Sequence, residues 1–295
     1  MKVLVSCKTT NLNVYGEAVK SKISKGSLST DHLQKLTMDH DHHYQSRTTL
    51  LSELERYGIQ YVIVRRGLFW PDLGDVDAVV TVGGDGTLLE ASHHINAEDV
   101  PILGLKSSPM SVGHLCSFSE EQIVDMVDQL ANNKLKVTPL TRLQAEVHFT
   151  SNGGRLSTGP VLNDFLYTNA NPAGTSRYRL RVGDITEDHK SSGLWLSTAA
   201  GSTAAISAAG GKVMDLNDTH SQYWVRELYT APGAVKAKLT HGLVDLNKKP
   251  ISIENHCDRA ILALDGRRSS IELTYGDLVN FSKAKPLRVL RSSRH

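Results

Sequence analysis

The sequence predicts two domains: an α/β domain with a parallel sheet, followed by an antiparallel, β-rich domain. A chain of 295 residues is long for one compact domain and comfortable for two. In the first half, strand and helix patterns alternate at the spacing of βαβ units. After about Thr138, apolar and polar residues alternate with the period of half-buried strands. The apolar share of 40% is typical of a globular chain.

The first domain is expected to contain short buried strands separated by amphipathic helices. The predicted strands are apolar runs rich in β-branched residues: Val3–Ser6, Ile59–Arg65, Ala78–Val82 and Val100–Gly104. The predicted helices are Arg47–Tyr57, Leu88–Ile95 and Glu120–Leu130. Residues 11–43 are polar, and we expect them to be mostly loop with a short helical piece near Leu28–Leu36.

The second domain is expected to consist of strands joined by Gly-rich turns. Its predicted strands are Gln144–Phe149, Val161–Tyr167, Tyr178–Val182, Leu194–Ser197, Ile251–Glu254, Ile261–Leu264, Ser270–Leu273 and Leu278–Phe281. Only Ser202–Ala209 has a helical pattern there. We therefore expect a first domain at 1–138, a second at 139–284 and a tail at 285–295. The tail strand, Leu287–Leu290, is expected to return toward the first domain.

The turn Gly83-Gly84-Asp85-Gly86-Thr87 carries the strongest functional signal. It follows an apolar strand and precedes a helix, which is how α/β proteins build a phosphate site: glycines expose backbone N–H groups, and a helix N-terminus favours an anion. Asp85 is unexpected there, because a carboxylate repels phosphate unless it binds Mg²⁺ or accepts a proton from a hydroxyl that is being phosphorylated. The turn therefore indicates phosphoryl transfer. The alternative is a tight structural turn with an Asp N-cap.

Two polar segments of the second domain are further candidates. Gly201-Ser202-Thr203 follows a strand and begins a run of small residues that ends at Gly210-Gly211, where a flat ligand or another backbone could approach closely. The alternative is an Ala/Ser helix packed on a sheet. Asn163-Asp164 interrupts an apolar strand, and burying it requires polar partners such as ribose hydroxyls or an amide. The alternative is a bend between strands.

Charge and cysteine content exclude several classes of function. A net charge of +2 argues against a nucleic-acid or anionic-membrane partner, and no apolar run approaches the roughly 18 residues of a membrane span. The three cysteines are scattered and odd in number, which favours reduced thiols in the cytoplasm. The end of the chain, Ser293-Arg294-His295, shares the small-basic start of peroxisomal tripeptides and leaves a peroxisome as the alternative.

The cluster Asp39–His43 is expected to be a solvated loop, and no metal site is expected.

The three motifs together resemble those of the NAD kinase family, in order and at similar spacing. They are Gly83–Thr87, Asn163-Asp164 and the segment Ser197-Thr198-Ala199-Ala200-Gly201-Ser202-Thr203-Ala204. The resemblance spans nearly the whole chain, from Lys8-Thr9-Thr10 to Asp265-Gly266. Finer features resemble the plant-type NADH kinases: Gly113-His114-Leu115-Cys116, Ser191-Ser192-Gly193-Leu194 and Arg226-Glu227.

The resemblance implies a Rossmann-like N-terminal α/β domain and a C-terminal β-sandwich-like domain, with the active site in the cleft. It implies transfer of the γ-phosphoryl of ATP, with Mg²⁺ or another divalent cation, to the 2′-hydroxyl of the adenosine ribose of NADH or NAD⁺. Asp85 matches the family's proton acceptor. The residues that match its nucleotide-binding positions are Gly84, Gly86, Thr87, Asn163, Asp164, Thr203, Ala204 and Ser207. It also implies a homodimer or a higher oligomer, in which a neighbouring subunit completes the nucleotide site.

The chain departs from the common family pattern at positions that contact nucleotide. Ser192 replaces an Asp and Ala205 replaces a Tyr, and the plant-type NADH kinases share both changes. A preference for the reduced dinucleotide is therefore a hypothesis. Lys106 replaces an Asn, and the sequence assigns it no role. Two alternatives stay open: a lipid kinase that uses the same turn for diacylglycerol or sphingosine, and a non-catalytic dinucleotide-binding protein.

Overall fold

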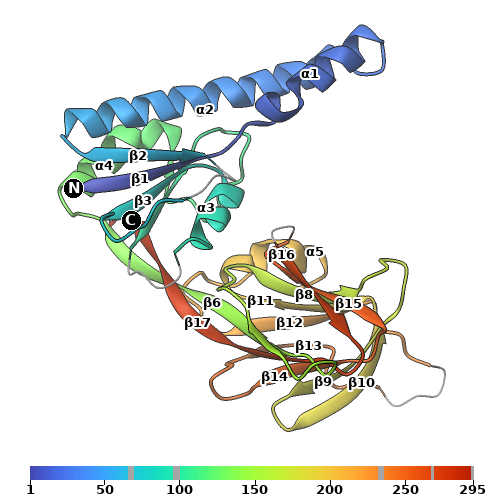
Figure 1. Cartoon of the computed structure of the whole chain (residues 1–295). Helices are drawn as coiled ribbons and strands as arrows, with labels where there is room; N and C mark the ends of the chain where they lie inside the picture. The colour runs from blue at the N-terminus through green and yellow to red at the C-terminus, as the bar shows by residue number, and fades with distance from the viewer. Residues whose placement is uncertain (66–69, 96–99, 232–235, 267–268, 294–295) are drawn as a thin grey trace. The chain divides into compact units, whose positions relative to one another are not determined.

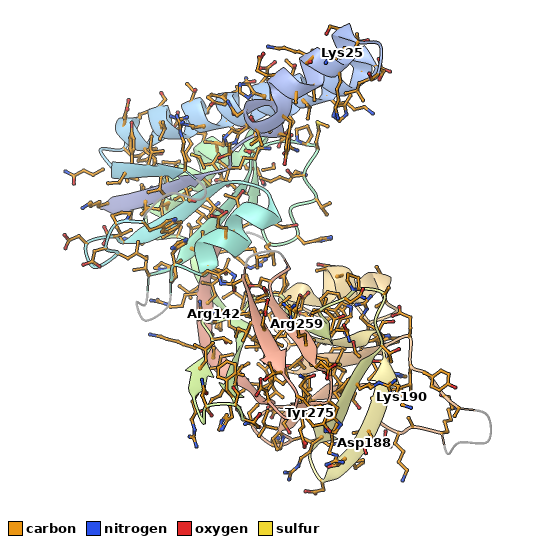
Figure 2. All side chains as sticks on the ribbon, turned by 45° about the vertical axis from the view of Figure 1, so that its right-hand side comes forward. Lys25, Arg142, Asp188, Lys190, Arg259 and Tyr275 are labelled. Atoms are coloured by element: carbon orange, nitrogen blue, oxygen red, sulfur yellow. The ribbon has the colours of Figure 1, made fainter. Side chains whose placement is uncertain are left out.

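The chain divides into two compact units (Figure 1). The computed structural model describes residues 1–65, 70–95, 100–231, 236–266 and 269–293. Unit 1 consists of Met1–Thr138 and Arg288–His295, and unit 2 of Pro139–Leu287. Side chains fill the interior of both (Figure 2). Among the described residues, no helix is both long and apolar enough to cross a membrane.

Unit 1 is built on a parallel sheet, which confirms the predicted α/β class. Its strand order is β17-β4-β3-β1-β2, with β5 paired to β4. The strands are β1 (Lys2–Cys7), β2 (Gln60–Arg65), β3 (Ala78–Gly83), β4 (Ile102–Lys106), β5 (Phe118–Ser119) and the end of β17 (Leu278–Arg291). Every residue of β3 is buried, as expected for a central strand covered on both faces.

Helices cover both faces of this sheet (Figure 1). The apolar sides of α2 (Thr30–Arg56) and α4 (Ile123–Ala131) pack on one face, and α3 (Asp85–Ser92) packs on the other. A short 3₁₀ turn, η1 (Glu120–Gln122), leads into α4 and carries a capping box. The strands all point the same way, so their carboxyl ends share the edge where the Gly83–Thr87 turn lies.

The prediction that residues 11–43 are mostly loop is wrong. They form α1 (Asn11–Ser24) and the first half of α2, and the cluster Asp39–His43 lies within that helix. The buried apolar residues of α2, Leu50 and Leu54, are confined to its C-terminal half, so no apolar stripe marks the rest. Contact with α1 and polar bonds hold the N-terminal half instead, among them Lys8 Nζ to Asp39 Oδ1 at 2.8 Å. Tertiary contacts therefore stabilise a helix that local pattern does not predict.

Unit 2 is a sandwich of antiparallel strands, which confirms the predicted β-rich class. One sheet contains β10-β9-β14-β17, with β6 and β7 at its side, and the other has the order β13-β12-β11-β8-β15-β16. Their inward side chains form one core, in which Phe165 and Tyr167 of one sheet meet Phe281 and Tyr178 of the other. Within this unit the buried Arg142 donates from Nε to the Lys285 carbonyl at 2.8 Å.

The strands of unit 2 are more numerous than the sequence predicts. They are β6 (Lys136–His148), β7 (Arg155–Ser157), β8 (Asp164–Asn169), β9 (Ser176–Val182), β10 (Ile185–Ser191), β11 (Gly193–Ser197), β12 (Ser221–Arg226), β13 (His241–Val244), β14 (Ile251–Asn255), β15 (Arg259–Leu264) and β16 (Ser269–Thr274). The sequence misses β7, β10, β12 and β13. The predicted helix Ser202–Ala209 is shorter than expected: η2 (Ala200–Thr203) is a 3₁₀ turn, and α5 (Ala205–Ala208) is a single helical turn. The last strand, β17, leaves unit 2 and ends in unit 1, where Val289 is the register partner of Ile102.

Candidate active site

The Gly83–Thr87 turn of unit 1 is packed so closely that it needs glycine. A Cβ on Gly83 would lie 2.1 Å from Thr87 Oγ1, and one on Gly84 would lie 3.0 Å from Ser111 Oγ. Gly84 is the N-cap of α3 in extended conformation. Thr87 is 3% exposed, so its hydroxyl faces the interior of the turn. Gly86, by contrast, is exposed and has open space beside it, which leaves the backbone at the helix start accessible.

Asp85 is held by the loop that follows β4. It is the first residue of α3, and its half-buried carboxylate accepts the backbone N–H of His114 at 3.0 Å (Oδ2) and that of Leu115 at 2.7 Å (Oδ1). The N-cap position belongs to Gly84, so Asp85 is not an N-cap. Two charge-assisted bonds from backbone fix the orientation of the carboxylate, while each oxygen keeps a lone pair for another donor.

Lys106 lies beside this loop, at the end of β4. It is the register partner of Gly83, and a Cβ on Gly113 would lie 2.7 Å from Lys106 Cδ. Gly113 has φ +74°, a conformation that favours glycine. Burial raises the pKa of the Cys116 thiol to about 12; the charge of Asp85 adds to this, and that of Lys106 opposes it. The structure thus places a cation near the Gly-rich turn.

The Asn163-Asp164 pair of unit 2 is organised by a carboxylate from a distant turn. Asp265 accepts the backbone N–H groups of Leu162 at 3.0 Å, Asn163 at 2.7 Å and Asp164 at 3.1 Å. Asp164 itself is 4% exposed, and β8 begins at this residue. Burial, followed by the nearby charge of Asp265, raises the pKa of the Asp164 carboxyl to about 7.

The second Gly-rich segment packs directly on this pair. The Asn163 carbonyl accepts the Thr198 N–H at 2.9 Å and the Ser197 hydroxyl at 3.1 Å. A Cβ on Gly201 would lie 2.2 Å from the same carbonyl oxygen, so only glycine allows this approach. The side-chain Oδ1 of Asn163 is buried and has no hydrogen-bond partner within the described ranges. An unpaired buried acceptor is costly unless a donor reaches it.

The other predicted nucleotide-binding residues follow at the start of α5. Thr203 ends η2, Ala204 connects it to α5, and Ser207 lies within α5; all three are partly exposed. Ala205 is exposed. The structure therefore brings the second and third motifs together in unit 2, whereas the Gly83–Thr87 turn belongs to unit 1.

Comparison with known proteins identifies the family. The model of the ATP-NAD kinase N-terminal domain matches residues 18–135. A probable NADH kinase of Oryza sativa subsp. japonica is 32% identical over 267 residues, which cover 83% of this chain and 80% of that protein. The chain belongs to the NAD kinase family. An NADH kinase of Arabidopsis thaliana is 31% identical over 249 residues, 76% of this chain and 75% of that protein. The resemblance of the three motifs to the NAD kinase family is thereby confirmed.

Two solved structures share the fold of this NAD kinase family member. Yeast NADH kinase complexed with NADH has a TM-score of 0.74 at 14% identity, covering 99% of this chain and 84% of that one. An NAD kinase from Archaeoglobus fulgidus in complex with ATP has a TM-score of 0.68 at 17% identity, covering 100% and 95%. The predicted fold class, an N-terminal α/β domain and a C-terminal β-sandwich-like domain, is confirmed.

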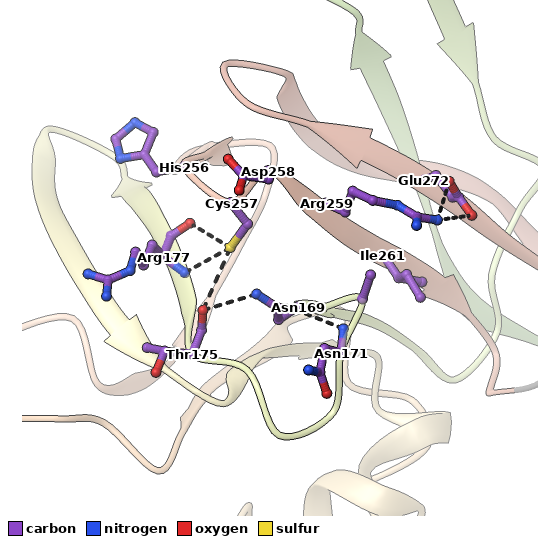
Figure 3. Close-up of a pocket in the computed structure, with 11 residues that line it drawn as sticks. Asn169, Asn171, Thr175, Arg177, His256, Cys257, Asp258, Arg259, Ile261 and Glu272 are labelled. Atoms are coloured by element: carbon purple, nitrogen blue, oxygen red, sulfur yellow. Dashed lines mark hydrogen bonds and ion pairs between the residues drawn. The ribbon is translucent and has the colours of Figure 1, made fainter.

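One cavity of this NAD kinase family member is not formed by the three motifs. It measures about 680 Å³ and lies in unit 2, where Cys257 Sγ accepts the Arg177 N–H at 3.1 Å (Figure 3). None of the sequence-predicted site residues lines it. All three cysteines are free, and no group of three or more His, Cys, Asp and Glu within the described ranges could hold a metal.

Sequence reasoning missed Asp265 as a member of the site. An Asp-Gly turn is an ordinary hairpin signal, and nothing local connects it with a segment about a hundred positions earlier. Its left-handed backbone, with φ 47°, is unusual for a residue other than glycine, but this becomes visible only in the structure. For Lys106 the sequence shows only a departure from the family pattern, and its place beside the Gly-rich turn depends on the fold.

Proposed function

We propose that this chain transfers the γ-phosphoryl group of ATP to the 2′-hydroxyl of the adenosine ribose of NADH or NAD⁺, forming NADPH or NADP⁺. Membership of the NAD kinase family supports this, as do the names of the plant relatives. The observation that carries it is the Asp85 carboxylate, oriented by two backbone N–H groups at the start of a glycine-rich helix N-terminus.

The proposed chemistry uses Asp85 as proton acceptor. The ribose oxygen forms a bond to the γ-phosphorus, the bond from that phosphorus to the β-phosphate oxygen breaks, and ADP leaves with the electron pair. The hydroxyl proton passes to Asp85. Gly84 and Gly86 would bind phosphate through backbone N–H groups at the start of α3. Thr87 would line this site, because its side chain is buried and its N–H already donates to the Gly84 carbonyl at 2.9 Å.

Unit 2 supplies the proposed dinucleotide site. The unpartnered Oδ1 of Asn163 is an acceptor suited to a ribose hydroxyl, and Asp164 lies next to it. Because the pKa of Asp164 is raised to about 7, its carboxyl can be a donor or an acceptor near neutral pH. Thr203, Ala204 and Ser207 would contact the nucleotide from the start of α5.

A divalent cation is expected to arrive with the donor. Mg²⁺ usually takes one or two carboxylates and completes its shell with phosphates and water, which fits a chain whose described residues form no three-ligand cluster. When bound, it would neutralise charge on the phosphates. Asp85 is the carboxylate of the turn that could reach it.

Four finer assignments belong to the same proposal: the preferred dinucleotide, the oligomeric state, the compartment and the domain bounds. Ser192 and the exposed Ala205 would favour NADH over NAD⁺, as the names of the plant relatives suggest. The protein would be a homodimer in the cytoplasm, with domains at 1–138 and 139–284. The peroxisomal alternative depends on Arg294 and His295, which lie outside the described residues. A lipid kinase is not favoured, because the curated relatives are NAD(H) kinases.

The test is a coupled assay with ATP and either dinucleotide. Pure wild-type protein is expected to phosphorylate NADH, and Asp85→Asn to lower kcat by about 10²–10⁴-fold. Asp75→Asn, at an exposed position, is the matched control. Phosphorylation of neither dinucleotide would overturn the kinase proposal, and an unchanged kcat in Asp85→Asn would remove Asp85 from the chemistry. Ala205→Tyr tests selectivity: an unchanged NADH/NAD⁺ ratio of kcat/KM would exclude Ala205 as its source.

A further inference from the structure

A small cavity in unit 1 has a cationic lining that the three motifs do not account for. It measures about 250 Å³ and lies at the carboxyl ends of β1 and β2, against α2. Lys8, Arg47 and Arg65 contribute the charged groups, and among the residues that the structure describes no Asp or Glu lines it. A cavity of this size is large enough for phosphate groups but small for a whole nucleotide.

The charge of this cavity is only partly compensated. Lys8 Nζ is bonded to both oxygens of Asp39, at 2.8 and 2.9 Å. The Arg47 guanidinium lies over the Tyr44 ring, 5.7 Å from its centroid. Within the described ranges, neither Arg47 nor Arg65 forms an ion pair with a carboxylate. Two guanidinium groups that face a cavity without a carboxylate indicate an anionic ligand.

Cys7 and His43 also line the cavity, and neither of them adds negative charge. Burial raises the pKa of the Cys7 thiol to about 11, so the thiol stays protonated. Burial lowers the pKa of His43 to about 4, and His43 is neutral at physiological pH. Its Nδ1 contacts the Ser107 hydroxyl at 3.0 Å. The net charge of the lining therefore comes from the two arginines.

The cavity lies at the same sheet edge as the Gly-rich turn. Cys7 is the register partner of Val82, the residue before Gly83, and the Lys8 N–H donates to the Val82 carbonyl at 3.0 Å. Neighbouring strands are about 4.8 Å apart, so the end of β1 lies one strand away from the turn. A chain of phosphates that starts at the N-terminus of α3 can extend along this edge toward the arginines.

We propose that this cavity binds the α- and β-phosphates of the phosphoryl donor, with Arg47 and Arg65 as its ligands. The inference rests on the proposed kinase function and adds residues outside the three motifs. Arginine suits this role because its planar guanidinium binds two phosphate oxygens at once. The same diphosphate chemistry could also come from a free phosphate-bearing effector, and the experiment separates the two sources.

The first measurement is calorimetric binding of inorganic pyrophosphate, without dinucleotide and without turnover. Arg47→Gln and Arg65→Gln are each expected to weaken pyrophosphate binding by at least about tenfold. Arg47→Lys is expected to weaken it less, because lysine keeps the positive charge but cannot bind two phosphate oxygens through a planar guanidinium. Arg56→Gln, on the same helix but paired with Glu53, is the control. Equal pyrophosphate affinity in wild type and both glutamine variants would overturn the proposal. Thermal melts verify that each variant is folded.

The second measurement is steady-state kinetics. The same variants are expected to raise KM for ATP by about the factor lost in pyrophosphate binding and to leave KM for NADH within about twofold. Pyrophosphate should compete with ATP. If pyrophosphate binding depends on the two arginines but pyrophosphate does not compete with ATP, the cavity binds an effector. That result would overturn the assignment of the cavity to the phosphoryl donor. Failure of the wild type to phosphorylate any dinucleotide would instead overturn the proposed function.

Discussion

Replacing Asp265 with asparagine removes a buried charge that holds three backbone N–H groups. Oδ1 accepts from Asn163 and Asp164, and Oδ2 accepts from Leu162. An asparagine side chain has the same shape but only one acceptor oxygen. If that oxygen takes the Oδ1 position, the amide NH₂ faces the Leu162 N–H, and two donors point at each other. One backbone N–H is left unpaired in a buried site.

The expected loss of unfolding free energy for Asp265→Asn is about 2–5 kcal/mol. An unsatisfied buried donor costs about 1–3 kcal/mol, and exchanging a charged acceptor for a neutral one weakens each remaining bond by roughly 0.5–1 kcal/mol. An opposing effect appears at higher pH. The raised pKa of Asp164 means that its ionisation destabilises the folded state as pH rises from about 4 to about 7, and the charge of Asp265 contributes to this. Because Asp265→Asn removes the charge of Asp265, the variant regains part of this free energy of unfolding at higher pH.

The assay is urea unfolding followed by tryptophan fluorescence, because Trp195 and Trp224 both lie in unit 2. The destabilisation by Asp265→Asn should be larger near pH 5 than near pH 8, since Asp164 is protonated at the lower pH in both proteins. Asp184→Asn, in an exposed turn of the same unit, controls for loss of an aspartate. A destabilisation below about 1 kcal/mol at both pH values, or a larger one near pH 8, would refute the reasoning.

Three further predictions follow from close contacts and burial within each unit. Gly83→Ala should destabilise unit 1 and lower kcat, because its Cβ would overlap Thr87; a melting temperature equal to wild type would contradict this. Gly201→Ala should raise KM for NADH more than KM for ATP by displacing the Asn163 carbonyl, as steady-state kinetics would detect. His43 has a pKa of about 4 in the folded state against about 6.5 unfolded, so stability should fall by roughly 3 kcal/mol as pH drops through that interval. His43→Gln should flatten this part of the pH profile in chemical unfolding, and an unchanged slope would contradict the assignment.

The sequence predicts well those strands whose pattern of apolar residues matches the pattern of buried positions. The fully buried β3 is a mostly apolar run, and buried and exposed residues alternate along β9 with period 2. Both strands can therefore be predicted from a few consecutive residues. The N-terminal half of α2 shows the opposite case. Its buried side chains include His43 and Ser46, which are polar, and a polar helix without an apolar stripe cannot be told from a loop.

The candidate site divides in the same way. The Gly83–Thr87 turn is recognisable because its function depends on consecutive residues: glycines that admit close packing and an acid at the helix start. That the acid is Asp85 was predictable. That His114 and Leu115 hold it was not, because those N–H groups come from a loop about thirty positions later. Whether the carboxylate is mobile or fixed therefore depends on chain folding.

The sequence by itself determined the two domain classes, the glycine-rich turn with its acid, and the family to which the chain belongs. Each of these features depends on local periodicity or on consecutive residues, which can be recognised without the fold. The tertiary structure alone decided that Asp265 organises the Asn163-Asp164 pair from 101 to 103 positions away, and that Arg47 and Arg65 face one cavity. The physical reason is that hydrogen bonds and charge act through space, so their partners are fixed only when distant segments pack.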